Sequence, residues 1–237
     1  SSGAALGAVA TAMFIGSETS SVDQLPGALL GAGIAVGVTV GVGKSGAIQR
    51  MVLVGVAVSA LCSALTSIFL VVDEAQLATV MSWLSGRLAG VRLSGIMPAL
   101  IAVLVVVPLT LVGAKTLDLL VAGDAVAGAV GAKPERIRLA AIVAAVVLIA
   151  PAVAATGPIG FLGLMAAAVA WRVCGPHHRM GLCVAGFVGA AVLLVADSVG
   201  QAIWAPAETP VGIVTSLAGM PLVLWSVHAL GRRKHAA

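Results

Sequence analysis

Long runs of apolar residues, separated by short polar stretches, dominate this chain of 237 residues. A helix needs roughly 20 apolar residues to cross the hydrocarbon core of a bilayer. Each run therefore predicts one membrane-spanning helix, and the first run is long enough only for part of one. The expected spans are residues 3–15, 25–42, 51–72, 95–112, 139–156, 159–173, 182–199 and 211–230.

Two longer intervals interrupt this pattern. Residues 74–94 are less apolar and contain Trp83, whereas residues 115–138 form the longest polar segment and mix acidic and basic residues with glycine. Strands do not explain the apolar runs, because the strands of a membrane barrel alternate apolar and polar residues over about 10 positions. Only helices satisfy their own backbone within a continuous run. We expect an all-α, polytopic bundle of transmembrane helices.

Composition supports a membrane location. Hydrophobic residues make up 60% of the chain, charged residues make up 9%, and the mean hydropathy is +1.15. A soluble domain carries about 25% charged residues, so lipid must cover much of this surface. The net charge of +4 does not indicate nucleic-acid binding, because no basic patch is interleaved with aromatic residues.

The distribution of basic residues predicts the orientation. If the chain starts on the cytoplasmic side and each run crosses once, eleven of the 13 lysines and arginines lie inside and only Arg87 and Arg92 lie outside. Loops on the cytoplasmic side of membrane proteins are enriched in these residues. We therefore expect eight crossings of the cytoplasmic (inner) membrane, with the C-terminus in the cytoplasm.

Catalytic and metal-binding patterns do not emerge from the sequence. Residues 43–45 read Gly-Lys-Ser but lack the earlier glycine of a phosphate-binding loop. The adjacent His177 and His178 cannot share one helix face as metal ligands. The cysteines have no metal-binding spacing and are expected to be packed small residues; they are Cys62, Cys174 and Cys183. We expect no enzymatic activity and no bound metal.

Several short motifs follow one another in a fixed order. Those of the first half are SSGAALGAVA at 1–10, LVGVAVSALCSALTS at 53–67 and WLSGRLAG at 83–90. Those of the second half are GPIGFLGL at 157–164, GPHHR at 175–179, GAAVLLVAD at 189–197 and AETPVGIVTSLAGMPLVLW at 207–225. This succession resembles the permeases of ATP-binding-cassette (ABC) importers for ferric siderophores, haem and cobalamin.

The resemblance covers essentially the whole chain and implies an architecture. Such permeases have ten helices, and SSGAALG marks the third, so this chain is expected to lack the first two and to form one permease domain over 1–237. The implied partners are a second permease subunit, two ATPases that bind ATP and magnesium, and an external substrate-binding protein. The chain itself is expected to bind no cofactor.

The expected substrate is an iron–siderophore complex, and cobalamin or haem is the alternative. A secondary, ion-coupled transporter is the alternative from another class. Such carriers usually need ionisable residues inside the membrane, and here Asp197 alone lies near a span.

The resemblance also implies three sets of functional residues. Such permeases have short coupling helices, which dock on the ATPase, in the polar segment before GPIGF; here that segment is residues 122–138, within 115–138. Docking is expected of Asp124, Gly131, Lys133, Pro134, Glu135, Arg136 and Arg138. The translocation path is expected to include Ser59, Ser63, Ser67, Thr215 and Ser216. Docking of the binding protein is expected of Arg87, Arg92, Gln201 and Glu208.

Simpler interpretations of these residues stay open. Segment 115–138 could be a solvated loop that carries the usual cytoplasmic charge. Ser59, Ser63 and Ser67 recur every four residues and so share one helix face, where small residues also serve close packing. The chain departs from the family pattern at several positions, among them Gln201 in place of an arginine. These departures favour a pair of non-identical permease subunits.

Overall fold

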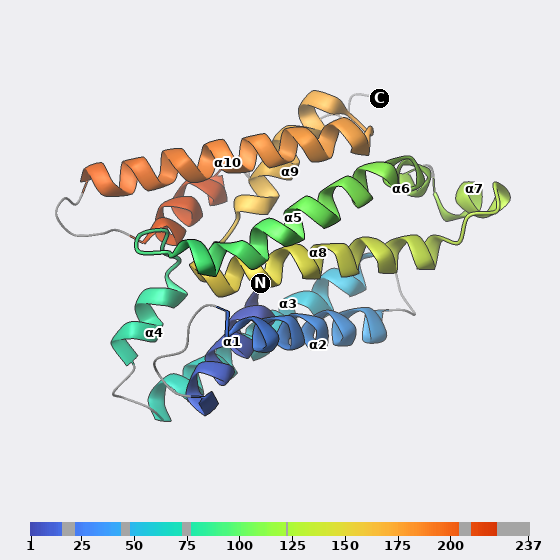
Figure 1. Ribbon diagram of the computed structural model, residues 1–237. Coiled ribbons are helices and arrows are strands. Elements are labelled where there is room, and N and C mark those ends of the chain that lie inside the picture. The colour runs from blue at the N-terminus through green and yellow to red at the C-terminus, as the bar shows by residue number, and fades with distance from the viewer. Residues whose placement is uncertain (16–21, 44–47, 73–76, 122, 204–209, 222–237) are drawn as a thin grey trace. The chain divides into compact units, whose positions relative to one another are not determined.

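The computed structural model describes residues 1–15, 22–43, 48–72, 77–121, 123–203 and 210–221 (Figure 1). Every regular element in these residues is a helix, so the all-α prediction is confirmed. The helices are α1 (Ser2–Ile15), α2 (Leu25–Gly43), α3 (Ile48–Val72), α4 (Leu77–Leu84), α5 (Leu93–Val112), α6 (Ala114–Val121), α7 (Asp124–Ala129), α8 (Pro134–Thr156), α9 (Leu162–Cys174) and α10 (His178–Ile203). A further helix runs from Val211 to Pro221.

Five helices of the described part are long and apolar enough to cross a membrane. These five apolar segments are residues 25–42, 50–71, 93–112, 134–156 and 178–203. Three shorter apolar helices lie at 2–14, 162–174 and 211–221. Their large apolar side chains are widely exposed; Leu104 on α5 is 65% exposed and Leu194 on α10 is 66% exposed. The chain is a multi-pass membrane protein. The count of eight crossings stays a prediction, and the expected span 211–230 is described only as far as Pro221.

Both intervals between the predicted spans contain helices, which the resemblance implied for the polar segment and which no pattern predicted for residues 74–94. Residues 74–94 contain α4, and the polar segment 115–138 contains most of α6, all of α7 and the first turn of α8. Helix α8 begins at Pro134 because a proline lacks the N–H that the first turn leaves unpaired and already has a helical φ. Helix α9 starts three residues later than the predicted span, since Phe161 at its N-cap is left-handed with φ of 60°.

The contacts divide the chain into two compact units. Unit 1 comprises residues 1–84, 90–107 and 138–158, and unit 2 comprises residues 85–89, 108–137 and 159–237. Two of the boundaries fall inside helices, one in α5 and one in α8, and the others lie between helices. Almost all of the predicted coupling segment therefore belongs to unit 2, together with α9 and α10. The single domain over 1–237 stays a prediction.

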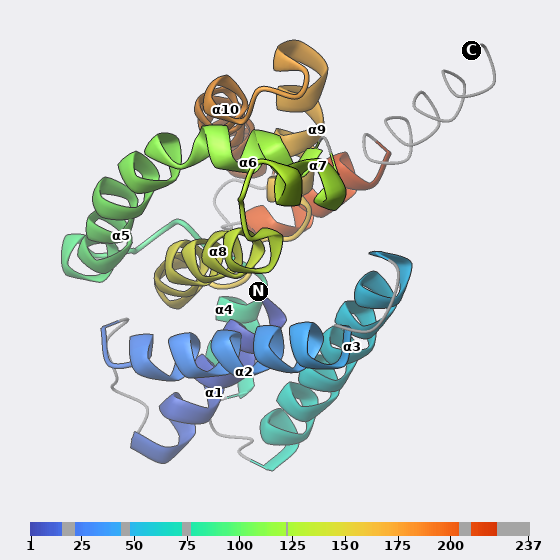
Figure 2. The ribbon, with the colours of Figure 1, turned by 90° about the vertical axis from the view of Figure 1, so that its right-hand side faces the viewer.

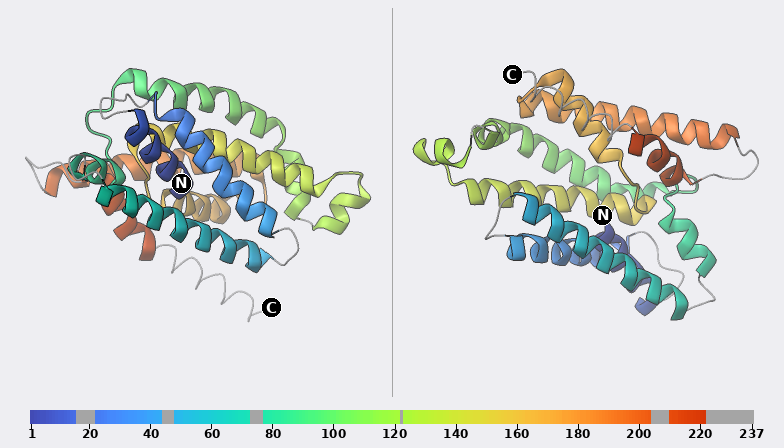
Figure 3. Two further views of the ribbon diagram at one scale, coloured as in Figure 1. Left: turned by 90° about the horizontal axis from the view of Figure 1, so that it is seen from below. Right: turned by 180° about the vertical axis from the view of Figure 1, so that it is seen from behind.

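In unit 1, helices α1, α2 and α3 lie against one another (Figures 2 and 3). Helices α1 and α2 cross at glycines because there is no room for a side chain between them. A Cβ atom on Gly3 would lie 2.5 Å from the carbonyl oxygen of Gly31, and one on Gly7 would collide with the carbonyl of Gly27. Such close approach of backbones at small residues is the usual basis of helix association in lipid.

Alanines fill the centre of unit 1. Ala4, Ala8, Ala28 and Ala150 are all completely buried, and Val153 and Ala154 complete this contact between α1, α2 and α8. Larger side chains surround the alanines; they are Leu25, Leu29, Trp83, Leu84 and Val146. These small residues thus form the buried centre of this unit.

In unit 2, α9 and α10 form a helical hairpin closed by a short turn. Gly175 makes this turn possible, since its φ of +62° suits glycine. The helix Val211–Pro221 packs against the start of α9, where a Cβ atom on Gly219 would lie 2.6 Å from the Cβ of Phe161. Its Thr215 is completely buried. The final described helix is therefore held on α9 by another glycine contact.

Candidate coupling surface and translocation path

The predicted coupling segment folds as two short helices followed by the first turn of α8. Only Gly113 separates α6 from α5. Its carbonyl accepts a hydrogen bond from the N–H of Leu117 at 3.3 Å, which belongs to the first turn of α6. Gly123, with φ of +103°, turns the chain into α7, and Asp124 occupies the first turn of that helix. A negative charge is favourable there because the N-terminus of a helix carries a partial positive charge.

Gly131 ends α7 in a glycine-specific motif. Its φ is +83°. Its N–H bonds to the carbonyl of Gly128 at 2.9 Å, and the next N–H, of Ala132, bonds to the carbonyl of Ala127 at 3.0 Å. This pair of bonds is the Schellman motif, which places a left-handed glycine after the last helical residue. The space around Gly131 is open, so its backbone conformation and not its surroundings requires glycine.

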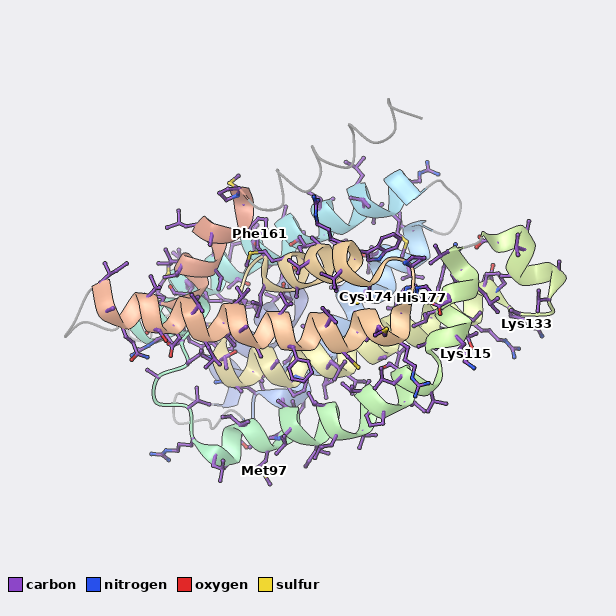
Figure 4. All side chains as sticks on the ribbon, turned by 90° about the horizontal axis from the view of Figure 1, so that it is seen from above. Met97, Lys115, Lys133, Phe161, Cys174 and His177 are labelled. Carbon is purple, nitrogen blue, oxygen red and sulfur yellow. The ribbon has the colours of Figure 1, made fainter. Side chains whose placement is uncertain are left out.

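The charged residues of this segment face outward. Asp124, Lys133, Glu135, Arg136 and Arg138 are exposed. Pro134 is half-buried at the start of α8. Figure 4 shows Lys115 and Lys133 at the same end of unit 2 as Cys174 and His177, whereas Phe161 lies away from that end. Residues that the charge pattern assigns to one side of the membrane thus occur together within unit 2; their role in docking stays a prediction.

Asp118 on α6 is bound to the first residue of α10, which the sequence analysis did not anticipate. Its Oδ1 accepts a hydrogen bond from the backbone N–H of His178 at 2.8 Å and lies 2.7 Å from His178 Nδ1. The backbone bond, followed by the ring contact, holds the pKa of Asp118 below its usual value of 3.8. The only signal in the sequence was that the predicted topology places this acid and the histidine pair on the same side of the membrane.

The three serines that share one face of α3 are hydrogen-bonded, and two of them are exposed. Ser63 and Ser67 are exposed, and each donates a hydrogen bond to the carbonyl four residues earlier at 3.1 Å. Ser59 donates to the Oγ of Ser2 at 3.0 Å. It also lines a largely apolar cavity of about 410 Å³ within unit 1, to which α1, α2, α3 and α8 contribute. All three hydroxyls therefore have a partner, Ser63 and Ser67 within α3 and Ser59 with Ser2 of α1, and the exposed Ser63 and Ser67 can still contact a passing molecule.

The two hydroxyls predicted for the last span lie inside unit 2. Thr215 Oγ1 and Ser216 Oγ both donate to the carbonyl of Gly212, at 3.1 and 2.7 Å. Ser216 is close to Gly160, because a Cβ atom there would lie 2.9 Å from its Oγ. Both hydroxyls therefore have partners in this structure, and their place in a path stays a prediction.

The residues predicted to meet a binding protein lie near helix ends. Gln201, close to the end of α10, donates to Asp197 Oδ2 at 2.8 Å. Arg92 is exposed just before α5, and Arg87 is half-buried in the stretch between α4 and α5. Glu208 lies outside the described residues. Asp197 is thus bonded to the glutamine that stands where the family pattern has an arginine.

Metal ligands do not gather in the part of the chain that the structure describes. No group of three or more histidine, cysteine, aspartate or glutamate side chains is close enough there to hold an ion. The described cysteines are free thiols, and Cys62 is buried in α3.

The fold is similar to that of known transport proteins. A solved structure described as a metal-chelate type ABC transporter in an inward-facing conformation matches with a TM-score of 0.84 and 28% identity, over 96% of this chain and 73% of that chain. The FecCD transport family matches residues 1–229. The chain belongs to the FecCD transport family.

Curated relatives are import-system permeases for several substrates. The iron(3+)-hydroxamate permease FhuG of Bacillus subtilis is 37% identical over 74% of this chain and 53% of its own length. The cobalamin permease BtuC of Halobacterium salinarum is 36% identical over 95% of this chain and 61% of its own length. The hemin permease HmuU of Yersinia pestis is 36% identical over 77% of this chain and 55% of its own length. The chain spans little more than half the length of these relatives.

Proposed function

We propose that this chain is a permease subunit of an ABC importer that takes up an iron–siderophore complex across the cytoplasmic (inner) membrane. The observation that carries the proposal is the family match over residues 1–229. Iron-chelate permeases recur among the relatives, and they include the hydroxamate and two dicitrate permeases. The C-terminus is proposed to be cytoplasmic, in keeping with the distribution of lysine and arginine.

In this function the exposed charges around α7 would dock on a cytoplasmic ATPase. Asp124 and Glu135 supply negative charge, and the basic residues Lys133, Arg136 and Arg138 supply positive charge. Exposed charges contribute more to the orientation and rate of association than to its affinity. ATP and magnesium would bind to the ATPase, and this chain would contribute no catalytic group.

The path itself would be lined with hydroxyls. Ser63 and Ser67 form an exposed, uncharged polar face on α3, and Ser59, Thr215 and Ser216 are the other proposed members. Such a wall would let a bulky chelate pass without binding it tightly. Substrate would arrive from an external binding protein that docks near Arg87, Arg92, Gln201 and Glu208. The second permease subunit is proposed to be non-identical, because Gln201 replaces a docking charge of the family pattern.

Uptake by the complete transporter tests this function. The full-length permease, purified with the subunits that accompany it, is reconstituted in proteoliposomes and supplied with labelled ferric siderophore, haem or cobalamin. We expect ATP-dependent uptake of the ferric siderophore, which a variant ATPase unable to hydrolyse ATP abolishes. Preferred uptake of cobalamin or haem would change the substrate, and uptake that persists without ATP hydrolysis would identify an ion-coupled carrier instead. Two copies of this permease in the purified complex would exclude the non-identical pair.

A further inference from the structure

The carboxylate of Asp118 joins the coupling segment to a membrane-spanning helix. Its Oδ1 accepts a hydrogen bond from the backbone N–H of His178 at 2.8 Å and lies 2.7 Å from the ring Nδ1 of the same residue. The two residues are 60 positions apart in the sequence. The first N–H groups of a helix have no partner within the helix, so Asp118 satisfies a donor of α10 that would otherwise need water. The contact is a cap that comes from another helix.

The surroundings make this contact more than a surface ion pair. The Asp118 and His178 side chains are 34% and 29% exposed, so both are partly shielded from water. His177 lies close enough to contribute favourably to the charge of Asp118. Hydrogen bonds to a charged group are roughly twice as strong as those between neutral groups. The carboxylate is therefore held by two different groups of the same residue, one of which belongs to the backbone.

The contact lies where it connects a movement of α6 to the start of α10. Helix α6 has eight residues and opens the coupling segment, whereas α10 has 26 residues and therefore extends for about 39 Å. The turn before His178 has only three residues, 175–177, so the end of α9 is tied to the same point. A displacement of α6 must therefore move the start of α10 or break the bond to His178.

We propose that Asp118 is a positioning residue that transmits movement of the coupling segment to the α9–α10 hairpin through its bond to His178. This inference rests on the proposed function, because coupling presupposes an ATPase that docks on the segment. It goes beyond that function by assigning the step inside the permease to one pair of residues. Neither residue touches the substrate or ATP in this scheme.

The test compares variants in the full transporter, at equal amounts of assembled complex in proteoliposomes. Asp118→Ala removes the acceptor, and Asp118→Asn keeps an oxygen for the backbone N–H but loses the charge. His178→Ala keeps the backbone bond and removes the ring. Thr116→Ala is the matched control, because Thr116 is an exposed residue of the same helix. The measured quantity is the number of substrate molecules imported per ATP hydrolysed.

We expect Asp118→Ala to lower this ratio about tenfold, which is the change in an equilibrium that loss of one charge-assisted bond produces. Asp118→Asn and His178→Ala should lower it less, and Thr116→Ala should retain the wild-type ratio. A merely structural role would reduce the amount of complex and leave the ratio unchanged. A wild-type ratio in assembled Asp118→Ala overturns the proposal. If that variant does not assemble, wild-type ratios in both Asp118→Asn and His178→Ala overturn it.

Amide hydrogen exchange on the same complexes separates this inference from the proposed function. In Asp118→Ala, amides in the first turn of α10 should exchange about tenfold faster than in Thr116→Ala, by the same loss of one charge-assisted bond, and in Asp118→Asn, which keeps an oxygen for the backbone N–H, they should exchange faster by a smaller factor. Unchanged exchange overturns the contact whatever the transport result. A wild-type complex that imports nothing in an ATP-dependent manner overturns the proposed function, even where the exchange result shows that the contact exists.

Discussion

Gly7 of α1 and Gly27 of α2 face each other so closely that a Cβ atom on either would collide with the carbonyl oxygen of the other. The same helix α2 carries a second set of glycines, Gly33, Gly37 and Gly41, around which the structure leaves open space. Glycine content alone does not distinguish the two faces of α2. In the structure, the face that carries Gly27 crosses α1, and the face that carries Gly33, Gly37 and Gly41 is exposed.

Gly7→Ala should therefore destabilise the protein, while Gly37→Ala should not. Overpacking of a close contact costs about 1–3 kcal/mol. Replacing an uncrowded glycine within a helix by alanine gains about 0.5–1 kcal/mol. Thermal unfolding of the two purified variants in the same detergent measures the difference. Equal stability of Gly7→Ala and Gly37→Ala would mean that α1 and α2 do not cross at Gly7.

Gly131→Ala should weaken coupling between ATP hydrolysis and import, and Gly131→Asn should retain more of it. The left-handed conformation costs an ordinary L-residue about 1–2 kcal/mol, and asparagine tolerates it better. The measurement is substrate imported per ATP hydrolysed, with the amount of assembled complex as the control. Gly131→Leu should uncouple without loss of assembly as well, because a leucine meets the same cost of the left-handed conformation and the space around Gly131 is open. Full coupling in Gly131→Leu would exclude a coupling role for this turn.

Ser63→Leu should obstruct uptake if the serine face of α3 lines the path. Ser198→Leu is the control, because Ser198 is also exposed and also donates to a carbonyl four residues earlier, at 2.8 Å, but lies on α10. We expect a severalfold lower uptake rate for the α3 variant alone, at unchanged complex assembly. Equal rates for the two variants would favour the packing interpretation of the serines.

Gly219→Ala should loosen the helix Val211–Pro221 from α9, because the added Cβ would meet that of Phe161 at 2.6 Å. We expect a loss of about 1–3 kcal/mol in stability. Gly163→Ala is the control, since the space around Gly163 is open. Adding Phe161→Gly to Gly219→Ala removes the colliding atom and relieves the left-handed φ of 60°. The double variant should recover part of the loss; strictly additive effects would show that the two residues do not touch.

The stabilisation that the Asp118–His178 contact gives to the folded chain should decrease at low pH. The pKa of Asp118 is lower in the folded chain than its ordinary value of 3.8. The stabilisation is therefore complete above that ordinary value and is lost as the pH falls through the lower, folded value. Thermal unfolding of wild type and Asp118→Asn should differ by a constant amount at neutral pH and converge only in strong acid. Convergence between pH 7 and pH 5 would contradict the assignment.

Much of the fold was predictable, because spans are set by length and hydropathy and these are properties of a single segment. The position of Gly131 was also predictable as a site that needs glycine. Short coupling helices in segment 115–138 were expected from the family resemblance. Their bounds, which are those of α6, α7 and the first turn of α8, came from the structure alone, because helices of only six to eight residues leave little periodicity in a sequence. The Asp118–His178 contact was missed for a different reason. It joins residues 60 positions apart, and only the packing of α6 on α10 brings them together.

Helix α9 has 13 residues and so rises only about 20 Å, which is less than the roughly 30 Å of a hydrocarbon core. In the predicted topology, in which this segment crosses the membrane, the remaining depth would be covered by the flanking backbone, including the turn at 157–161. Bare peptide groups are not tolerated in contact with lipid tails. The N–H of Gly157 bonds to Val153 at 2.8 Å, that of Leu162 bonds to Gly160 at 2.7 Å, and Gly157 itself is buried. The first residue of this turn is therefore covered by the protein's own atoms, whereas Phe161 at its end is 40% exposed.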